Sequence, residues 1–219
     1  ALKIGVIELK EQELRSGRHS PYFINSGKFD SGRSMNKLTS AYARVIREHF
    51  QKDGNFTFDV LYGPPYKGTM IVPALAGKLE TVHDPIRYCS SCKEAKQHSD
   101  EGLLLAAPIR PGDRVLIVDD VIADGWTKKG AVKFIEEQGG EPVGLVISVD
   151  RQEKAHDYDF DTNLEFSAAQ KFEREYHIPV VAVATLNDLV KVLERQQRDD
   201  GEKKKVLEKI RAYQRMYGV

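Results

Sequence analysis

Apolar and polar residues along this chain follow two periods in turn. Short runs rich in β-branched and aliphatic residues, typical of buried strands, alternate with segments in which apolar residues recur at helical spacing. The strand-like runs are 58–62, 115–118, 143–149 and 180–184, and the helix-like segments are 38–50, 68–80, 128–138, 167–176 and 186–217, the last broken near Asp199, Asp200 and Gly201. This alternation predicts an α/β fold with a mostly parallel central sheet and helices on both faces.

One of these runs leads directly into a pair of acidic residues. Residues 115–118 are followed by Asp119 and Asp120, then by a short loop with Gly125, and a helical pattern opens at Lys128. Open parallel sheets bind ligands beyond the carboxyl ends of their strands. The amides at the start of the next helix suit a phosphate. Carboxylates for sugar hydroxyls beside amides for a phosphate predict a ribose-phosphate site, although a helix cap with a salt bridge is the alternative.

A second strand ends in a turn that no helix would tolerate. Gly63, Pro64 and Pro65 follow residues 58–62, and Lys67 comes two residues later. The Lys67 ammonium is therefore expected to reach a phosphate at the same sheet edge, and we expect Gly63 and Gly68 to allow close backbone approach to a ligand. An exposed loop lysine is the ordinary alternative.

Composition narrows the class of protein further. Of 219 residues, 41% are hydrophobic, and 33 Lys and Arg balance 33 Asp and Glu, so no net charge favours nucleic acid or a membrane surface. No apolar run approaches the roughly 20 residues that span a bilayer. We expect one domain over 1–219, with residues 1–33 as a hood, and a cytosolic location without membrane or nucleic-acid partners.

The two cysteines, Cys89 and Cys92, form a C-x-x-C pair. Such a pair can be a redox centre or half a zinc site, but zinc needs two more ligands and only His83 and His98 lie nearby in sequence. We favour two free thiols, because cytosolic proteins rarely keep disulfides.

The ordered motifs resemble those of the type I phosphoribosyltransferases, and within them the orotate phosphoribosyltransferase family. Five segments carry the resemblance in the family's order: the base-binding segment 14–25, the pyrophosphate loop 62–68, the catalytic loop 93–98, the phosphoribosyl-diphosphate (PRPP) fingerprint 114–127 and the orotate-contacting turn 150–153. The resemblance implies the type I phosphoribosyltransferase fold. It also implies transfer of a phosphoribosyl group from PRPP to orotate, with Mg²⁺ carried by PRPP, in a homodimer whose catalytic loops reach across.

The resemblance also implies roles for particular residues. Asp119 and Asp120 would hold the ribose hydroxyls near the oxocarbenium-like centre, Lys96 would stabilise the leaving group, and His98 would supply a hydrogen bond or shuttle a proton. The substrate-binding residues would be Arg15, Phe23, Tyr66, Lys67, Lys93, Ala123, Asp124, Gly125, Trp126, Thr127 and Arg151. Among these, Phe23 would form the wall beside the flat base and Arg151 would bind its carboxylate, although Phe23 is also an ordinary core residue for a short strand.

Several positions depart from the family's pattern. The phosphate loop usually reads Thr-Ala-Gly-Thr, and here Asp124 and Trp126 place a carboxylate and a large ring at two of those positions. Cys92 replaces an arginine that contacts pyrophosphate, Ile24 replaces a second phenylalanine, and Arg15 replaces a lysine. A carboxylate facing a phosphate costs on the order of a few kcal/mol.

These departures leave three interpretations open: an active orotate enzyme with an altered loop, a relative that uses another base or donor, and a paralogue that binds without turnover. A regulator that senses PRPP and binds nucleic acid is a fourth. It would need a basic surface, and the run Lys203-Lys204-Lys205 lies between acidic Glu202 and Glu208.

Overall fold

The central element is a six-stranded sheet. The computed structural model describes residues 2–14, 16–80, 85–91, 104–122, 126–155, 165–196 and 201–219, and for 126–128 the backbone only. In sheet order the strands are β12 (Val180–Thr185), β11 (Glu141–Asp150), β10 (Arg114–Val121), β7 (Val60–Gly63), β8 (Arg87–Ser91) and β9 (Leu104–Ala106). All neighbours pair in parallel except β9, which runs antiparallel to β8.

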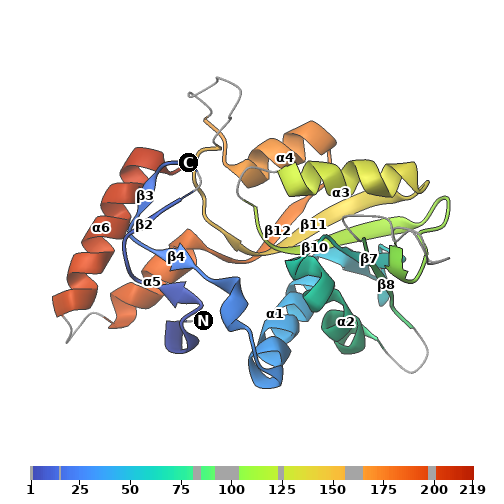
Figure 1. Cartoon of the computed structure of the whole chain (residues 1–219), viewed down its shortest axis with the longest axis horizontal. Coiled ribbons are helices and arrows are strands. Elements are labelled where there is room, and N and C mark those ends of the chain that lie inside the picture. Colours follow the sequence, from blue (N-terminus) through green and yellow to red (C-terminus); the bar gives the residue numbers. More distant parts are fainter. Residues whose placement is uncertain are drawn as a thin grey trace, which may run out of the picture.

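Helices cover both faces of this sheet (Figure 1). One face packs against α1 (Gly32–Phe50) and α2 (Lys67–Leu79), and the other against α3 (Trp126–Glu137) and α4 (Ala168–Tyr176). Alternation along β10 explains the two cores, because Leu116 and Val118 join the α1 and α2 side while Val115 and Ile117 join the α3 and α4 side. The predicted three-layer α/β architecture is therefore confirmed.

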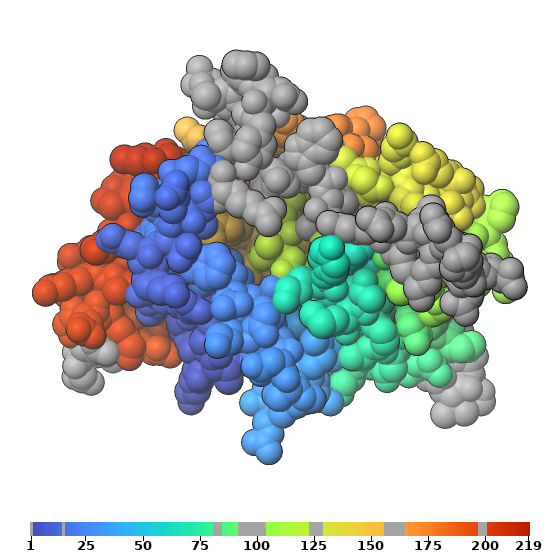
Figure 2. Space-filling model, viewed as in Figure 1, coloured from blue at the N-terminus to red at the C-terminus, as the bar shows by residue number. Residues whose placement is uncertain are grey.

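The amino-terminal segment, which we call the hood, packs on the last two helices. Its elements are η1 (Leu2–Ile4), β1 (Ile7–Glu8), β2 (Gln12–Glu13), β3 (His19–Ser20), β4 (Phe23–Ile24) and η2 (Ser26–Lys28). The buried ring of Tyr22 joins a core cluster with residues of α5 (Leu186–Gln196) and α6 (Gly201–Tyr217). In Figures 1 and 2 this blue segment lies against the red carboxyl-terminal helix. A hairpin of β5 (Gln51–Lys52) and β6 (Asn55–Phe56) follows α1.

Two sequence predictions need correction. The sequence predicted neither β8 nor β9, although both belong to the central sheet. β8 mixes polar with apolar residues and β9 has only three residues, so no clear period marks either strand. In addition, β10 continues to Val121, which places Asp119 and Asp120 inside the strand rather than after it.

The helix starts nearest the sheet's carboxyl edge are well defined. Ser31 caps α1 through a capping box with Ser34, in which the side chain of each accepts a hydrogen bond from the backbone amide of the other. The helix α2 begins four residues after β7 ends and contains Pro73, which is exposed. Within the described residues, none of the helices is long and apolar enough to cross a membrane.

Candidate active site

The two aspartates at the end of β10 differ in burial and in what their side chains contact. Asp119 is 3% exposed, its Oδ1 accepts a hydrogen bond from the Asp120 amide at 2.9 Å, and its carbonyl oxygen accepts one from the Tyr42 hydroxyl at 2.6 Å. Asp120 is half-buried, and its Oδ1 accepts a hydrogen bond from the Val121 amide at 2.8 Å. Asp119 is therefore built into the core, whereas Asp120 presents its carboxylate to the site.

Two serines from other elements also bond to Asp120. The Ser26 hydroxyl, on η2 of the hood, donates to Asp120 Oδ2 at 2.5 Å. The Ser148 hydroxyl, on the neighbouring strand β11, donates to the Asp120 carbonyl oxygen at 2.5 Å. The carboxylate is thus oriented from the hood, while the main chain is held from within the sheet.

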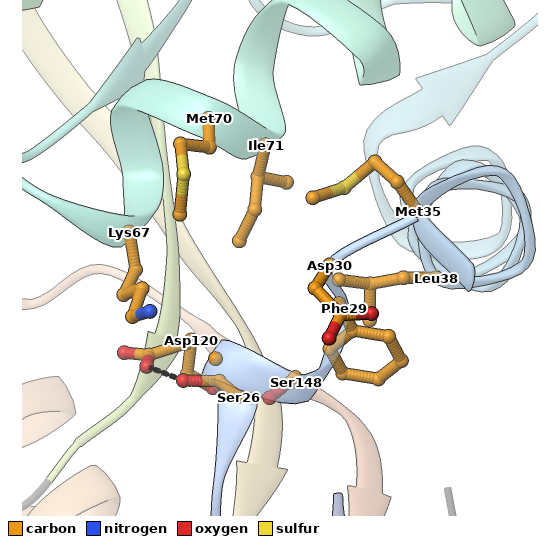
Figure 3. A pocket seen from close by; sticks show the side chains of 11 residues that line it. Ser26, Phe29, Asp30, Met35, Leu38, Lys67, Met70, Ile71, Asp120 and Ser148 are labelled. Atoms are coloured by element: carbon orange, nitrogen blue, oxygen red, sulfur yellow. Dashed lines mark hydrogen bonds between the residues drawn. The ribbon is translucent and has the colours of Figure 1, made fainter. Parts of the chain in front are cut away.

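A cavity of about 280 Å³ opens beside this carboxylate. It lies between the first turns of α1 and α2 and is lined by Ser26, Gly27, Phe29, Asp30, Met35, Leu38, Lys67, Met70, Ile71, Asp120 and Ser148. Figure 3 shows the Lys67 side chain, at the start of α2, directed toward Asp120; Met70 and Ile71 extend from the same helix, and Met35 lies across the cavity on α1. The structure therefore brings Asp120 and Lys67, two predicted site residues from different strand ends, to one cavity.

The glycines of the loop after β7 have a structural reason that the sequence did not reveal. A Cβ on Gly63 would lie 2.4 Å from the Gly68 carbonyl carbon, and one on Gly68 would lie 2.7 Å from the Val118 carbonyl oxygen. The structure therefore shows a close approach between protein backbones at these glycines, and the expected approach to a ligand stays a prediction. This packing fixes where α2 begins and hence where Lys67 points.

Arg151, the predicted cation for the base, lies in a buried polar network between the hood and α6. Its Nη2 lies 2.6 Å from Glu153 Oε1 and donates to the Ser20 hydroxyl at 3.1 Å, and the guanidinium lies 4.4 Å from the centre of the Tyr22 ring. Glu153 also accepts hydrogen bonds from the hydroxyls of Tyr22 at 2.9 Å and Tyr213 at 3.1 Å. Burial beside Glu153 raises the pKa of Tyr213 to about 12.

Phe23 is half-buried on β4. Its neighbour Ile24 packs into the cluster shared with α5 and α6. Because successive residues of a strand point to opposite faces, Phe23 is directed away from that cluster. This orientation suits the predicted wall for a base better than a core role.

The remaining predicted residues are only partly covered by the structure. Tyr66 is described and is 67% exposed at the start of α2. Trp126 and Thr127 form the first turn of α3, and their side chains are not described. Arg15, Lys93, Lys96, His98, Ala123, Asp124 and Gly125 lie outside the described residues, as does Cys92. Their predicted roles stay predictions.

Sequence reasoning missed both serines that bond to Asp120. The sequence could have pointed to Ser148, because it is a single hydroxyl residue within the apolar run 143–149. Nothing in the sequence points to Ser26, because its partner lies 94 positions away.

Cys89 is buried on β8, and burial raises the pKa of its thiol to about 12. A thiol with so high a pKa stays protonated at neutral pH and is a poor nucleophile and metal ligand. Among the described residues, no group of three or more His, Cys, Asp and Glu side chains is placed to hold a metal ion.

Comparisons with known proteins show which family this chain resembles. The phosphoribosyl transferase domain family matches residues 30–177. The chain is 37% identical to the orotate phosphoribosyltransferase of Aeromonas salmonicida, and 38% identical to that of Neisseria meningitidis serogroup C. These matches cover 100% of this chain and 95% and 94% of the two relatives. The crystal structure of the orotate phosphoribosyltransferase of Francisella tularensis superposes with a TM-score of 0.80 at 29% identity, over 100% of this chain and 97% of that one.

Proposed function

This chain belongs to the orotate phosphoribosyltransferases, a family of type I phosphoribosyltransferases, and from that membership we propose the reaction of its site. It transfers the 5-phosphoribosyl group of PRPP to orotate and releases orotidine 5′-phosphate and pyrophosphate. A bond forms between a ring nitrogen of orotate and the anomeric carbon as the bond from that carbon to pyrophosphate oxygen breaks. Pyrophosphate leaves with the electron pair, and the orotate nitrogen gives up its proton.

The observation that carries this proposal is the convergence of Asp120 and Lys67 on one cavity at the carboxyl edge of the sheet. As the bond to pyrophosphate breaks, positive charge develops on the ribose. Fixed groups aimed at developing charge are the largest source of rate enhancement in most enzymes. The Asp120 carboxylate is held by the hood and by its own strand, so it can accept ribose hydroxyls and face that charge without reorienting.

Negative charge builds at the same time on the leaving pyrophosphate. Lys67 is the described cation of the cavity and would bind a pyrophosphate oxygen. Lys93, Lys96 and His98 complete this half of the site in our proposal, by resemblance to the family's catalytic loop. Mg²⁺ would enter as the PRPP complex, and Asp120 offers the oxygen ligands that this ion prefers.

The base would bind on the hood side of the ribose. Phe23 is turned away from the hood core, so it can stack on the flat pyrimidine. Arg151 holds Glu153 and Ser20 through one guanidinium nitrogen, and a guanidinium has five N–H donors in all. Its other donors would bind the orotate carboxylate, and Arg15 would add a second positive charge.

Two further features belong to the proposal. The family resemblance implies a homodimer in which the catalytic loop of one subunit serves the site of the other. A closed loop would exclude the water that competes for the ribosyl cation. The predicted cytosolic location also remains part of this proposal.

The test is the loss of orotate absorbance when the purified protein is mixed with PRPP and Mg²⁺, with uracil, adenine and hypoxanthine assayed in parallel. We expect turnover with orotate alone, since Arg151 has no carboxylate to bind in the other bases. Turnover with another base would replace orotate as the substrate. PRPP binding without turnover on any base would contradict the catalytic proposal and leave a binding protein.

A further inference from the structure

The short helix η2 connects the hood to both groups that the proposed function assigns to PRPP. Ser26, its first residue, donates a hydrogen bond to the Asp120 carboxylate. Gly27 follows, and a Cβ at that position would lie 3.5 Å from the Lys67 ammonium. Figure 3 shows Ser26 and Asp120 joined beneath Lys67. This one turn therefore lies against the predicted ribose carboxylate and the predicted pyrophosphate cation together.

The turn is anchored on both sides, so Ser26 is held in place independently of Asp120. Before it, the Asn25 amide donates to the Val6 carbonyl oxygen at 2.7 Å, and the Asn25 side chain donates to Glu8 at 3.2 Å. After it, the capped start of α1 fixes the chain at Ser31. A hydroxyl on an anchored turn can orient a partner carboxylate, whereas a hydroxyl on a free loop would simply follow it.

We propose that Ser26 is a positioning residue for the transfer reaction, holding the Asp120 carboxylate in the orientation that faces the ribose. This inference rests on the proposed function, which assigns Asp120 to the ribose. The Ser26 hydroxyl bonds to Oδ2 and the Val121 amide to Oδ1, which fixes the plane of the carboxylate. A carboxylate has about four lone-pair positions, so the remaining ones stay open to ribose hydroxyls.

Ser148 makes the natural comparison for this role. It donates to Asp120 over the same 2.5 Å, but to the carbonyl oxygen instead of the carboxylate. Removing either hydroxyl deletes one hydrogen bond to the same residue, so both changes have a similar cost in stability. Only the Ser26 change frees the carboxylate to rotate.

The experiment compares Ser26→Ala with Ser148→Ala, Ser26→Thr and Ser40→Ala. Ser40 is an exposed α1 residue whose hydroxyl donates to the Asn36 carbonyl oxygen at 2.7 Å, and its replacement serves as the neutral control. For each variant we would measure kcat, KM for PRPP and for orotate, PRPP affinity by calorimetry, and Tm.

We expect Ser26→Ala to lower kcat about tenfold and to weaken PRPP binding about threefold, with KM for orotate unchanged, because Asp120 acts mainly on charge that develops in the transition state. Ser148→Ala should lower Tm by a similar amount with a several-fold smaller loss of kcat. Ser26→Thr, which restores a hydroxyl, should recover most of the activity, and Ser40→Ala should match the parent protein.

Equal kcat losses in Ser26→Ala and Ser148→Ala would overturn the positioning role, since both would then act through stability alone. Unchanged kcat and PRPP affinity in Ser26→Ala would overturn it as well. If the parent protein binds PRPP but does not turn over orotate, the proposed function fails. Weaker PRPP binding by Ser26→Ala than by Ser148→Ala would still support the link to Asp120, and equal binding would refute it.

Discussion

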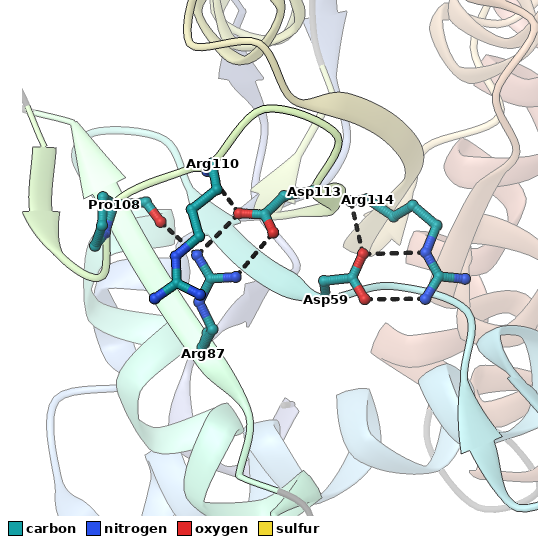
Figure 4. A network of polar contacts seen from close by, with 6 residues as sticks. All are labelled: Asp59, Arg87, Pro108, Arg110, Asp113 and Arg114. Carbon is teal, nitrogen blue, oxygen red and sulfur yellow. Dashed lines mark hydrogen bonds and ion pairs between the residues drawn. The ribbon is translucent and has the colours of Figure 1, made fainter.

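The aspartates at the amino edge and at the carboxyl edge of the central sheet have different bonding partners. At the amino edge, each carboxylate is held by an arginine through two bonds (Figure 4): Arg114 bonds to Asp59 at 2.9 and 3.0 Å, and Arg87 bonds to Asp113 at 2.8 Å through both nitrogens. At the carboxyl edge, the Asp120 carboxylate is bonded by a hydroxyl and an amide, and Lys67 faces it across a cavity.

The pKa values of aspartates also differ between the two edges of the sheet. Hydrogen bonds from Arg114 and Arg87 hold the pKa values of Asp59 and Asp113 below their ordinary value. At the carboxyl edge, burial raises the pKa of Asp150, the last residue of β11. Paired charges stabilise the fold at one edge, whereas the carboxylate and the cation at the other edge are the groups that we propose bind the substrate. If that proposal holds, the contrast separates residues of stability from residues of function on the same strands.

The largest effect should come from Asp120→Asn. It removes the charge that faces the developing ribosyl cation and keeps the shape of the side chain, so kcat should fall roughly 10²–10³-fold with little change in Tm. The measurement is orotate turnover beside thermal unfolding. Full activity in this variant would remove Asp120 from the mechanism and erase the difference between the edges.

Lys67→Met should have the next largest effect. Loss of a charged hydrogen bond to pyrophosphate costs about 2 kcal/mol, or roughly 30-fold in kcat/KM for PRPP. Lys78→Met is a matched control on the same helix, since Lys78 bonds to Asn36 at 3.2 Å and neither residue lines the cavity. Equal losses in both variants would indicate a helix effect instead of a pyrophosphate contact.

Asp113→Asn should show the reverse pattern at the amino edge. Arg87 would lose its ion pair and one of its two acceptor oxygens, because Asn is neutral and has a single side-chain oxygen. The free energy of unfolding should therefore fall by about 1.5 kcal/mol with kcat unchanged. Urea unfolding measures the loss. Glu48→Gln, which breaks the exposed pair between Arg44 and Glu48 on α1, provides a control expected to change stability by less than about 0.5 kcal/mol. A loss of turnover in Asp113→Asn without unfolding would show that the amino edge also serves the reaction.

The smallest effect is the pH dependence of stability. Carboxylates with lowered pKa values stabilise the fold above their unfolded pKa of about 4 and lose that contribution as the pH falls through the lower folded value. Asp59 and Asp113 should therefore make the protein less stable below about pH 4. Asp150, with its raised pKa, should offset part of this loss. Stability curves of Asp113→Asn should be flatter than those of the parent protein in this range, and parallel curves would contradict the assignment.

Sequence patterns located the catalytic edge but not its internal contacts. The apolar run before Asp119 and Asp120 identified a buried strand. Because parallel strands end at the same edge of a sheet, the sequence predicted that the acidic pair and Lys67 lie close together. The strands β8 and β9 were not predicted because segments of five and three residues are too short to show a clear period. The backbone packing of β7, α2 and β10 that Gly63 and Gly68 permit was not predicted either, because it is not a local property of the sequence.

The sequence alone determined the α/β class, the order of the main strands and helices, and the family, because these depend on local periodicity and on short motifs. Only the tertiary structure decided that Ser26 forms a hydrogen bond to Asp120 and that Glu153 contacts Arg151, Tyr22 and Tyr213. These contacts join segments 60 to 131 residues apart, apart from the neighbouring pair Arg151 and Glu153. The physical reason is that side-chain hydrogen bonds require angstrom-scale proximity, and packing of the hood against the last two helices creates that proximity only after the chain has folded.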